Sequence, residues 1–201
     1  PEIGIPVYRP SSKYWELCMT INDSWGYQQN DNNYKTPMQI IDLFVDTISK
    51  GGNLLLNISP KSDGSIPEKQ KLILKELGKW NKKHSSAIYS TKKGIAYDHF
   101  YGPSTLSKDN KTLFLFVRDI PKDNQIVLKG ISNKINRAYI VGNGTVLNQQ
   151  LLCKVYWNKY PGITYIEIPK KTLDPYYTVI AIVLDSPIKL FNKNTGAIEL
   201  N

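Results

Sequence analysis

Two stretches of sequence decide the fold of this chain, residues 15–27 (WELCMTINDSWGY) and residues 51–60 (GGNLLLNISP). Each contains a short apolar run typical of a buried strand and ends in a polar loop. A helical pattern lies between them and another follows, which makes two strand–loop–helix units. In parallel strand–helix folds, functional residues lie at the carboxyl ends of the strands. The two polar loops are therefore where the sequence predicts a site.

The helix between the two strands has clear start and stop signals. Thr36 is a suitable N-cap, Pro37 suits the first helical position, and Gln39 completes a capping box. Residues 51–52, both glycine, end the helix. Its apolar face consists of Ile40, Ile41, Phe44, Val45 and Ile48. The next strand, residues 53–58, reads as buried on both faces, as in a parallel sheet.

A second helix is predicted to begin at Pro67 and to end near Lys83. From about residue 94 the pattern changes from helical to alternating, with turn signals between short strands. This pattern is typical of an antiparallel sandwich. The expected strands are 113–117, 125–128, 137–141, 151–157, 163–168 and 178–184.

The predicted fold class is therefore α/β followed by all-β, with residues 1–93 in strand–helix units and residues 94–201 in a β-sandwich. A closed (β/α)8 barrel, or TIM barrel, needs roughly 250 residues. Two units cannot close such a barrel or bury their apolar faces. We therefore expect the chain to be the C-terminal part of a longer polypeptide, with the earlier units of the barrel before Pro1.

The composition is that of a globular domain, with 41% hydrophobic and 21% charged residues among 201. No apolar run approaches the ~18 residues of a membrane span, and no signal peptide is visible. The net charge is +9, but the lysines are scattered and no basic helix occurs. We expect a solvated lysine-rich surface and no nucleic-acid partner. Cys18 and Cys153 are expected to be buried free thiols.

Several motifs together resemble the α-L-fucosidases of glycoside hydrolase family 29. They are residues 15–20 (WELCMT), 24–27 (SWGY), 50–58 (KGGNLLLNI), 63–67 (DGSIP) and 87–89 (AIY). The resemblance covers the last units of the catalytic barrel and the C-terminal sandwich, which is essentially the whole chain. It implies a retaining exo-glycosidase that removes α-linked L-fucose from a fucosylated glycan or glycoconjugate, with no metal and no organic cofactor.

Retaining hydrolysis needs two carboxyl groups about 5 Å apart. In the family the nucleophile is an Asp on an earlier barrel strand, and no segment here matches that motif, so the nucleophile is expected before Pro1. Residues 1–6 (PEIGIP) match the family's acid/base loop, which makes Glu2 the expected catalytic residue. The rival is Glu16, because a carboxylate in a predicted buried strand must be paired or face the site.

The resemblance also implies that Trp25 packs against the apolar face and C6 methyl of fucose. Asn57 and Ser59, at the end of the second strand, are expected to tie the barrel together. His84 and His99 are expected to be surface or packing residues. Three further candidates for the site entrance lie near Trp25: Asn22, Asp23 and Tyr27.

Two other functions remain open from the residues alone. One is a non-catalytic carbohydrate-binding sandwich whose platform is the aromatic set Tyr156, Trp157, Tyr160, Tyr165, Tyr176 and Tyr177. The other is a basic nucleic-acid-binding domain, which predicts steep salt dependence of binding. Members of the family that the chain resembles are typically secreted, periplasmic or lysosomal, so the resemblance implies such a location. The linkage that is cleaved is not decided by the sequence.

Overall fold

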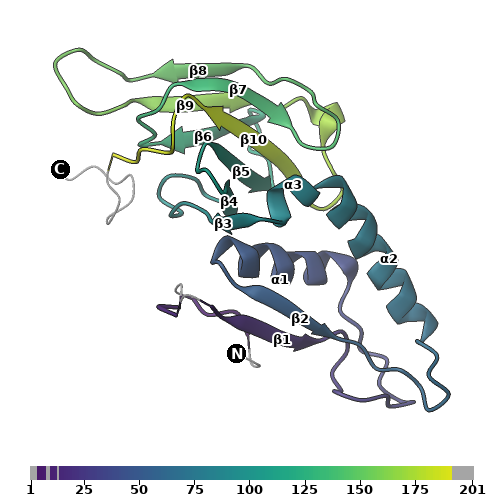
Figure 1. The fold of residues 1–201 in the computed structure, drawn as a ribbon. Helices are drawn as coiled ribbons and strands as arrows, with labels where there is room; N and C mark the ends of the chain where they lie inside the picture. Colours follow the sequence, from purple (N-terminus) through teal and green to yellow (C-terminus); the bar gives the residue numbers. More distant parts are fainter. Residues whose placement is uncertain (1–3, 8–9, 13, 192–201) are drawn as a thin grey trace. The chain divides into compact units, whose positions relative to one another are not determined.

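The computed structural model describes residues 4–7, 10–12 and 14–191 (Figure 1). Glu2 lies outside these described residues. The chain divides into two compact units, residues 1–85 and 86–201. The boundary expected between residues 93 and 94 falls later than this division, because strand β3 (Thr91–Lys93) pairs with β4 (Ser104–Ser107) and belongs to the second unit's sheet.

The first unit consists of two strand–helix pairs, in the order that the sequence predicts. The elements are β1 (Glu16–Thr20), α1 (Pro37–Ser49), β2 (Asn53–Asn57) and α2 (Glu68–Lys83). Strands β1 and β2 pair in parallel, so their carboxyl ends lie at the same edge. This is the arrangement that brings the two polar loops together.

Helix α1 begins and ends where its local signals predict. The Thr36 hydroxyl accepts from the Gln39 amide at 3.2 Å, and the Gln39 side chain accepts from the Thr36 amide at 2.8 Å, completing the capping box. After the helix, Gly51 has a positive φ of 83°. A Cβ atom at Gly52 would overlap the Trp15 indole, so the glycine lets the chain pass this ring into β2.

The two faces of the β1–β2 pair differ in burial. One face packs on the helices, where Leu56 contacts a core cluster that includes Ile40 and Ile73. Residues opposite in register share a face, so Glu16, Cys18 and Leu55 lie on the other face. Leu55 is 49% exposed there, and the expectation that the second strand is buried on both faces is wrong for the described chain. The reason is that no other described element covers that face.

The second unit contains two antiparallel sheets. Five strands form one sheet in the order β3-β4-β5-β10-β7, and three form the other in the order β6-β9-β8. A short helix, α3 (Ser85–Ile88), precedes β3 in the sequence, and a 3-10 turn, η1 (Lys170–Thr172), precedes the last strand. The remaining strands are β5 (Thr112–Val117), β6 (Gln125–Lys129), β7 (Ile135–Ile140), β8 (Gln149–Leu152), β9 (Ile163–Glu167) and β10 (Thr178–Leu184).

An apolar core lies between the two sheets, which confirms the predicted sandwich. It combines Leu115 and Ile180 from the larger sheet with Ile126, Leu128 and Ile166 from the smaller one, all of them buried. The alternation of buried and partly exposed positions in β6 and β9 is the period-2 pattern visible in the sequence. Strands β3 and β4 are short and polar, and the sequence pattern did not reveal them.

The strand expected at 151–157 is wrong in its bounds, because β8 ends at Leu152. The last pair in the β8–β9 ladder joins Leu152 to Ile163, and Cys153 then adopts a φ of 59°, which ends the strand. Residues 153–162 form a loop instead. Both cysteines are free, as expected, but neither is buried, since Cys18 is partly exposed and Cys153 is exposed.

Candidate active site at the ends of β1 and β2

The polar loops that follow β1 and β2 lie together at the carboxyl edge of the strand pair. The register is parallel throughout, from Glu16 opposite Asn53 to Thr20 opposite Asn57. One further backbone bond, from the Ile21 amide to the Asn57 carbonyl at 3.0 Å, extends the pairing into the loops. The edge is therefore where side chains from both loops meet, as parallel strand–helix folds require.

Trp25 lies in the loop after β1 with its side chain 52% exposed. Its backbone carbonyl accepts a 2.8 Å hydrogen bond from the Asn57 side-chain amide, at the end of β2. The loop backbone is thus attached to the neighbouring strand while the indole remains accessible. An exposed ring on a fixed backbone is suited to covering an apolar surface of a ligand.

Asn22 is the buried polar centre of the same loop, at 1% exposure. Its Nδ2 donates to Asp31 Oδ2 at 2.9 Å, and the Ser24 backbone amide donates to the same oxygen at 2.8 Å. Lys35 Nζ donates to the Asn22 carbonyl at 3.2 Å. Hydrogen bonds to Asp31, that from Ser24 foremost, hold the pKa of its carboxyl below the usual value. The Asp31 carboxylate is therefore the acceptor that organises the hydrogen bonds of this loop.

Ser59 connects this network to the second strand and its helix. Its hydroxyl donates to Asn22 Oδ1 at 3.3 Å, and its backbone amide donates to Gln70 Oε1 on α2 at 3.0 Å. Ser59 and Gln70 are both fully buried. As expected, the side chains of Asn57 and Ser59 link the strand ends. The roles of Asp31 and Gln70 were not foreseen, although Gln70 lies three positions before buried Ile73, on the inner side of α2.

Glu16 and Trp25, two of the site residues predicted from the sequence, do not lie together in the structure. Glu16 is exposed at the first position of β1, on the face that the helices do not cover, so the described chain does not provide the buried environment expected for it. Thr20, at the other end of β1, lies about 13 Å further along the strand at 3.3 Å per residue. Trp25 lies at that distal edge, so the structure does not bring Glu16 and Trp25 to the same end of β1.

The two histidines are packing residues. His84 and His99 are buried, at 0% and 1% exposure. Nδ1 of His84 lies 3.0 Å from the Trp80 carbonyl, and Nδ1 of His99 lies 2.8 Å from the Lys129 carbonyl. Within the described part of the chain no three His, Cys, Asp or Glu side chains cluster as metal ligands, and no helix has the length and apolarity to span a membrane.

Comparisons with known proteins agree with this architecture. Residues 5–86 match the family model described as alpha-L-fucosidase. The alpha-L-fucosidase of Dictyostelium discoideum is 30% identical over 169 residues, which is 81% of this chain and 36% of that protein. The plasma alpha-L-fucosidase of Rattus norvegicus is 44% identical over 80 residues, covering 38% of this chain and 17% of that protein.

Solved structures extend the likeness to both units. The alpha-L-fucosidase isoenzyme 1 from Paenibacillus thiaminolyticus superposes with a TM-score of 0.80 at 29% identity, over 92% of this chain and 44% of that chain. A GH29 alpha-L-fucosidase from Bacteroides thetaiotaomicron, trapped as a covalent intermediate with 2-fluoro-fucosyl fluoride, gives a TM-score of 0.70 at 25% identity. That match covers 86% of this chain and 38% of the other.

The strand–helix units, the loops at their carboxyl edge and the following sandwich define a glycoside hydrolase architecture. The chain belongs to the α-L-fucosidases of glycoside hydrolase family 29. It spans about a third or less of the curated relatives described above. The predicted fold class, the end of a catalytic barrel followed by a β-sandwich, is confirmed.

Proposed function

We propose that the protein containing this chain is a retaining exo-α-L-fucosidase, which removes terminal α-linked L-fucose from glycans by double displacement. The observation that carries the proposal is the exposed Trp25 indole, attached at the ends of two parallel strands in a member of this family. A covalent intermediate, such as the one trapped in the Bacteroides relative, is the hallmark of retention. That relative supports the double displacement proposed here.

The chemistry divides between two carboxyl groups. The nucleophile attacks the anomeric carbon and forms a glycosyl ester, while the acid protonates the departing oxygen. The same acid, now a carboxylate, then takes a proton from water, which attacks the anomeric carbon and releases fucose. We assign the acid/base role to Glu2, on the motif of residues 1–6, and propose that the nucleophile belongs to a part of the protein before Pro1.

Trp25 supplies the recognition of a deoxy sugar. L-Fucose has a methyl group at C6, and an indole that covers this methyl removes apolar surface from water. The bond from Asn57 to the Trp25 carbonyl supports this role, because it limits movement of the loop that carries the ring. Glu16 is the rival acid/base, and its place at the first position of β1 makes it the weaker candidate.

The test uses the full-length protein and an aryl α-L-fucoside. Wild type, Glu2→Ala and the control Glu16→Gln are compared, each with and without azide. The proposal predicts slow turnover by Glu2→Ala, rescue by azide with a fucosyl azide product, and near-normal turnover by Glu16→Gln. Loss of activity in Glu16→Gln alone transfers the role to Glu16. If wild type leaves the fucoside intact but binds glycans, the carbohydrate-binding alternative replaces the enzyme.

We also propose that the protein is secreted, periplasmic or lysosomal, and the plasma α-L-fucosidases among its relatives support a location outside the cytosol. Fractionation of the source cells, with activity followed on the aryl fucoside, tests this location. Activity confined to the cytosolic fraction contradicts it.

A further inference from the structure

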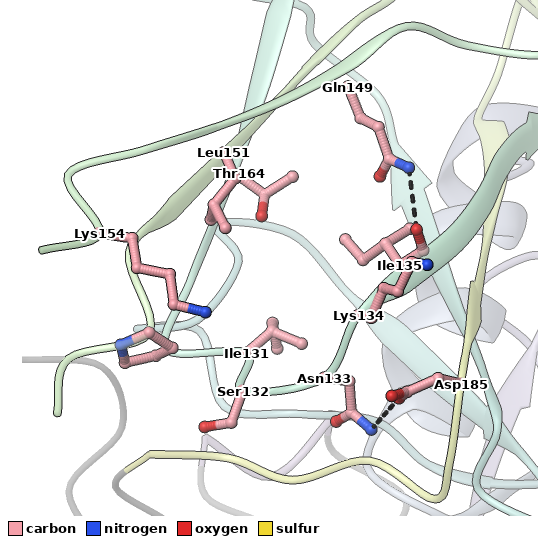
Figure 2. Close-up of a pocket in the computed structure, with 11 residues that line it drawn as sticks. Ile131, Ser132, Asn133, Lys134, Ile135, Gln149, Leu151, Lys154, Thr164 and Asp185 are labelled. Atoms are coloured by element: carbon pink, nitrogen blue, oxygen red, sulfur yellow. Dashed lines mark hydrogen bonds between the residues drawn. The ribbon is translucent and has the colours of Figure 1, made fainter. Parts of the chain in front are cut away.

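A pocket of about 480 Å³ lies on the sandwich unit, within residues 131–185 (Figure 2). Its size is within the range of small-ligand sites, about 300–1,000 Å³. Both apolar and polar side chains line it. The polar residues of the lining include Ser132, Lys134, Gln149, Lys154, Thr164 and Asp185.

Two ammonium groups give the pocket its positive character. Lys134 precedes β7 and Lys154 follows β8, and both side chains are exposed. Figure 2 shows the Lys154 ammonium directed into the hollow. Among the described residues neither lysine has an ion-pair partner within 4.0 Å. An anionic ligand could therefore interact with two lysine side chains of the lining that are not already neutralised by a carboxylate.

The one carboxylate in the lining, Asp185, is already engaged at the rim. Its Oδ1 accepts from Asn133 Nδ2 at 3.1 Å and from the Ser186 hydroxyl at 3.1 Å. These bonds, that from Asn133 foremost, lower the pKa of the carboxyl, so it is ionised at neutral pH. With two lysines against one aspartate, the pocket carries a net positive charge.

The other polar groups are of the kind that bind sugar hydroxyls. Gln149 is held in place because its Nε2 donates to the Ile135 carbonyl at 3.1 Å (Figure 2). Its Oε1 remains an acceptor, and the hydroxyls of Ser132 and Thr164 both donate and accept. The combination of neutral hydrogen-bonding groups with two cations suits a sugar that carries an acidic substituent.

The loop of residues 153–162 leaves the pocket at Lys154 and returns to it at Pro161. It carries two exposed aromatic rings, Tyr156 at 96% and Trp157 at 73%, whose centroids lie 4.8 Å apart in an edge-on arrangement. The two ends of the loop line the pocket, and exposed aromatic surface of this kind is typical of a ligand-binding surface.

The base of this loop is closely packed. Gly162 has a φ of 90°, and a Cβ atom at that position would lie 2.6 Å from the Leu152 carbonyl oxygen. Cys153 also has a positive φ, of 59°. The chain therefore needs these two left-handed residues to leave and re-enter the β8–β9 hairpin at this point. The packing fixes where Lys154 stands relative to β9.

We propose that this pocket binds an acidic sugar residue, one that carries a sulfate ester or a carboxylate. Lys134 and Lys154 contact the anionic group, Gln149 and Thr164 contact ring hydroxyls, and the Tyr156–Trp157 pair stacks on a neighbouring sugar of the same chain. The site is separate from the proposed fucosidase chemistry and does not depend on it. Through this pocket the protein would bind a glycan at one of its acidic sugar residues.

The test measures binding by calorimetry with the full-length protein at fixed ionic strength. The probes are a sulfated trisaccharide, a uronic acid trisaccharide and the neutral trisaccharide of the same backbone. The double variant Lys134→Gln/Lys154→Gln is compared with Lys108→Gln/Lys122→Gln, which loses the same charge at two exposed lysines outside the pocket. Turnover of the aryl fucoside is measured on every variant.

We expect the pocket variant to bind one acidic trisaccharide at least about tenfold more weakly, because each charge-assisted hydrogen bond is strong. The preferred probe distinguishes sulfate from carboxylate. Trp157→Ala is expected to weaken binding of that trisaccharide while leaving a single acidic monosaccharide unchanged. Equal losses in both double variants, or equal affinity for the neutral trisaccharide, overturn the proposal. Unchanged fucoside turnover in the pocket variant keeps the result independent of the catalytic assignment.

Discussion

The side-chain amide of Asn57 donates a 2.8 Å hydrogen bond to the backbone carbonyl of Trp25, across 32 positions of the chain. The bond joins the end of one parallel strand to the loop that follows its neighbour. It leaves the indole exposed while fixing the peptide that carries it.

Removing the Asn57 amide is expected to reduce activity, with only a small loss of stability. A single hydrogen bond contributes about 1 kcal/mol, so Asn57→Ala should lower kcat/KM on an aryl α-L-fucoside by roughly fivefold as the Trp25 loop loosens. The thermal midpoint should move by only a few degrees. Asn53→Ala, at the exposed beginning of the same strand, is the control and should leave kcat/KM unchanged. Equal effects of the two variants would contradict a role for the bond in positioning Trp25.

The carboxyl of Asp31 predicts acid sensitivity of the loop. Its pKa is lowered in the folded protein, chiefly by its hydrogen bond with Ser24, so the ionised form stabilises the fold. This contribution is present above the unfolded pKa, which is about 3.9, and is lost as the pH falls through the lower folded value. Asp31→Asn should therefore flatten the dependence of the unfolding free energy on pH below about 4.

The measurement for Asp31 is urea unfolding between pH 2.5 and 7, followed by tryptophan fluorescence. The control is Asp23→Asn, whose carboxylate accepts from the exposed Asn33 side chain in the same loop. Parallel pH curves for wild type and Asp31→Asn would show that the carboxylate does not stabilise the loop.

A methyl group is expected to have opposite effects at two glycines of the first unit. At Gly52 it would overlap the Trp15 indole, so Gly52→Ala should destabilise by about 1–3 kcal/mol. At Gly78, inside α2, a Cβ atom meets nothing within 4 Å. Gly78→Ala should stabilise by about 0.5–1 kcal/mol, because alanine loses less backbone entropy in a helix.

Chemical denaturation of the two variants against wild type checks both signs. A neutral Gly52→Ala would mean that the indole moves aside at little cost. A destabilising Gly78→Ala would mean that the helix position is less open than the contacts around it indicate.

Local signals account for the elements that the sequence predicted well. The capping box of Thr36 and Gln39 and the glycines at 51–52 act within a few residues, so they fix the ends of α1 wherever it packs. The period-2 burial of β6 and β9 is equally local. The bounds predicted for β8 are wrong because residues that favour a strand continue to Trp157, while the pairing with β9 stops at Leu152.

The sequence by itself determined the order of strands and helices, the family and the two loops in which a site should lie. Only the tertiary structure decided how Asn22 meets Ser59, 37 positions away, and how Lys134 and Lys154 come to line one pocket. It also placed Glu16 on an exposed face rather than in a core. The physical reason is range: caps and periodicity depend on neighbours within one or two turns, whereas these contacts depend on which strands pair and in which register.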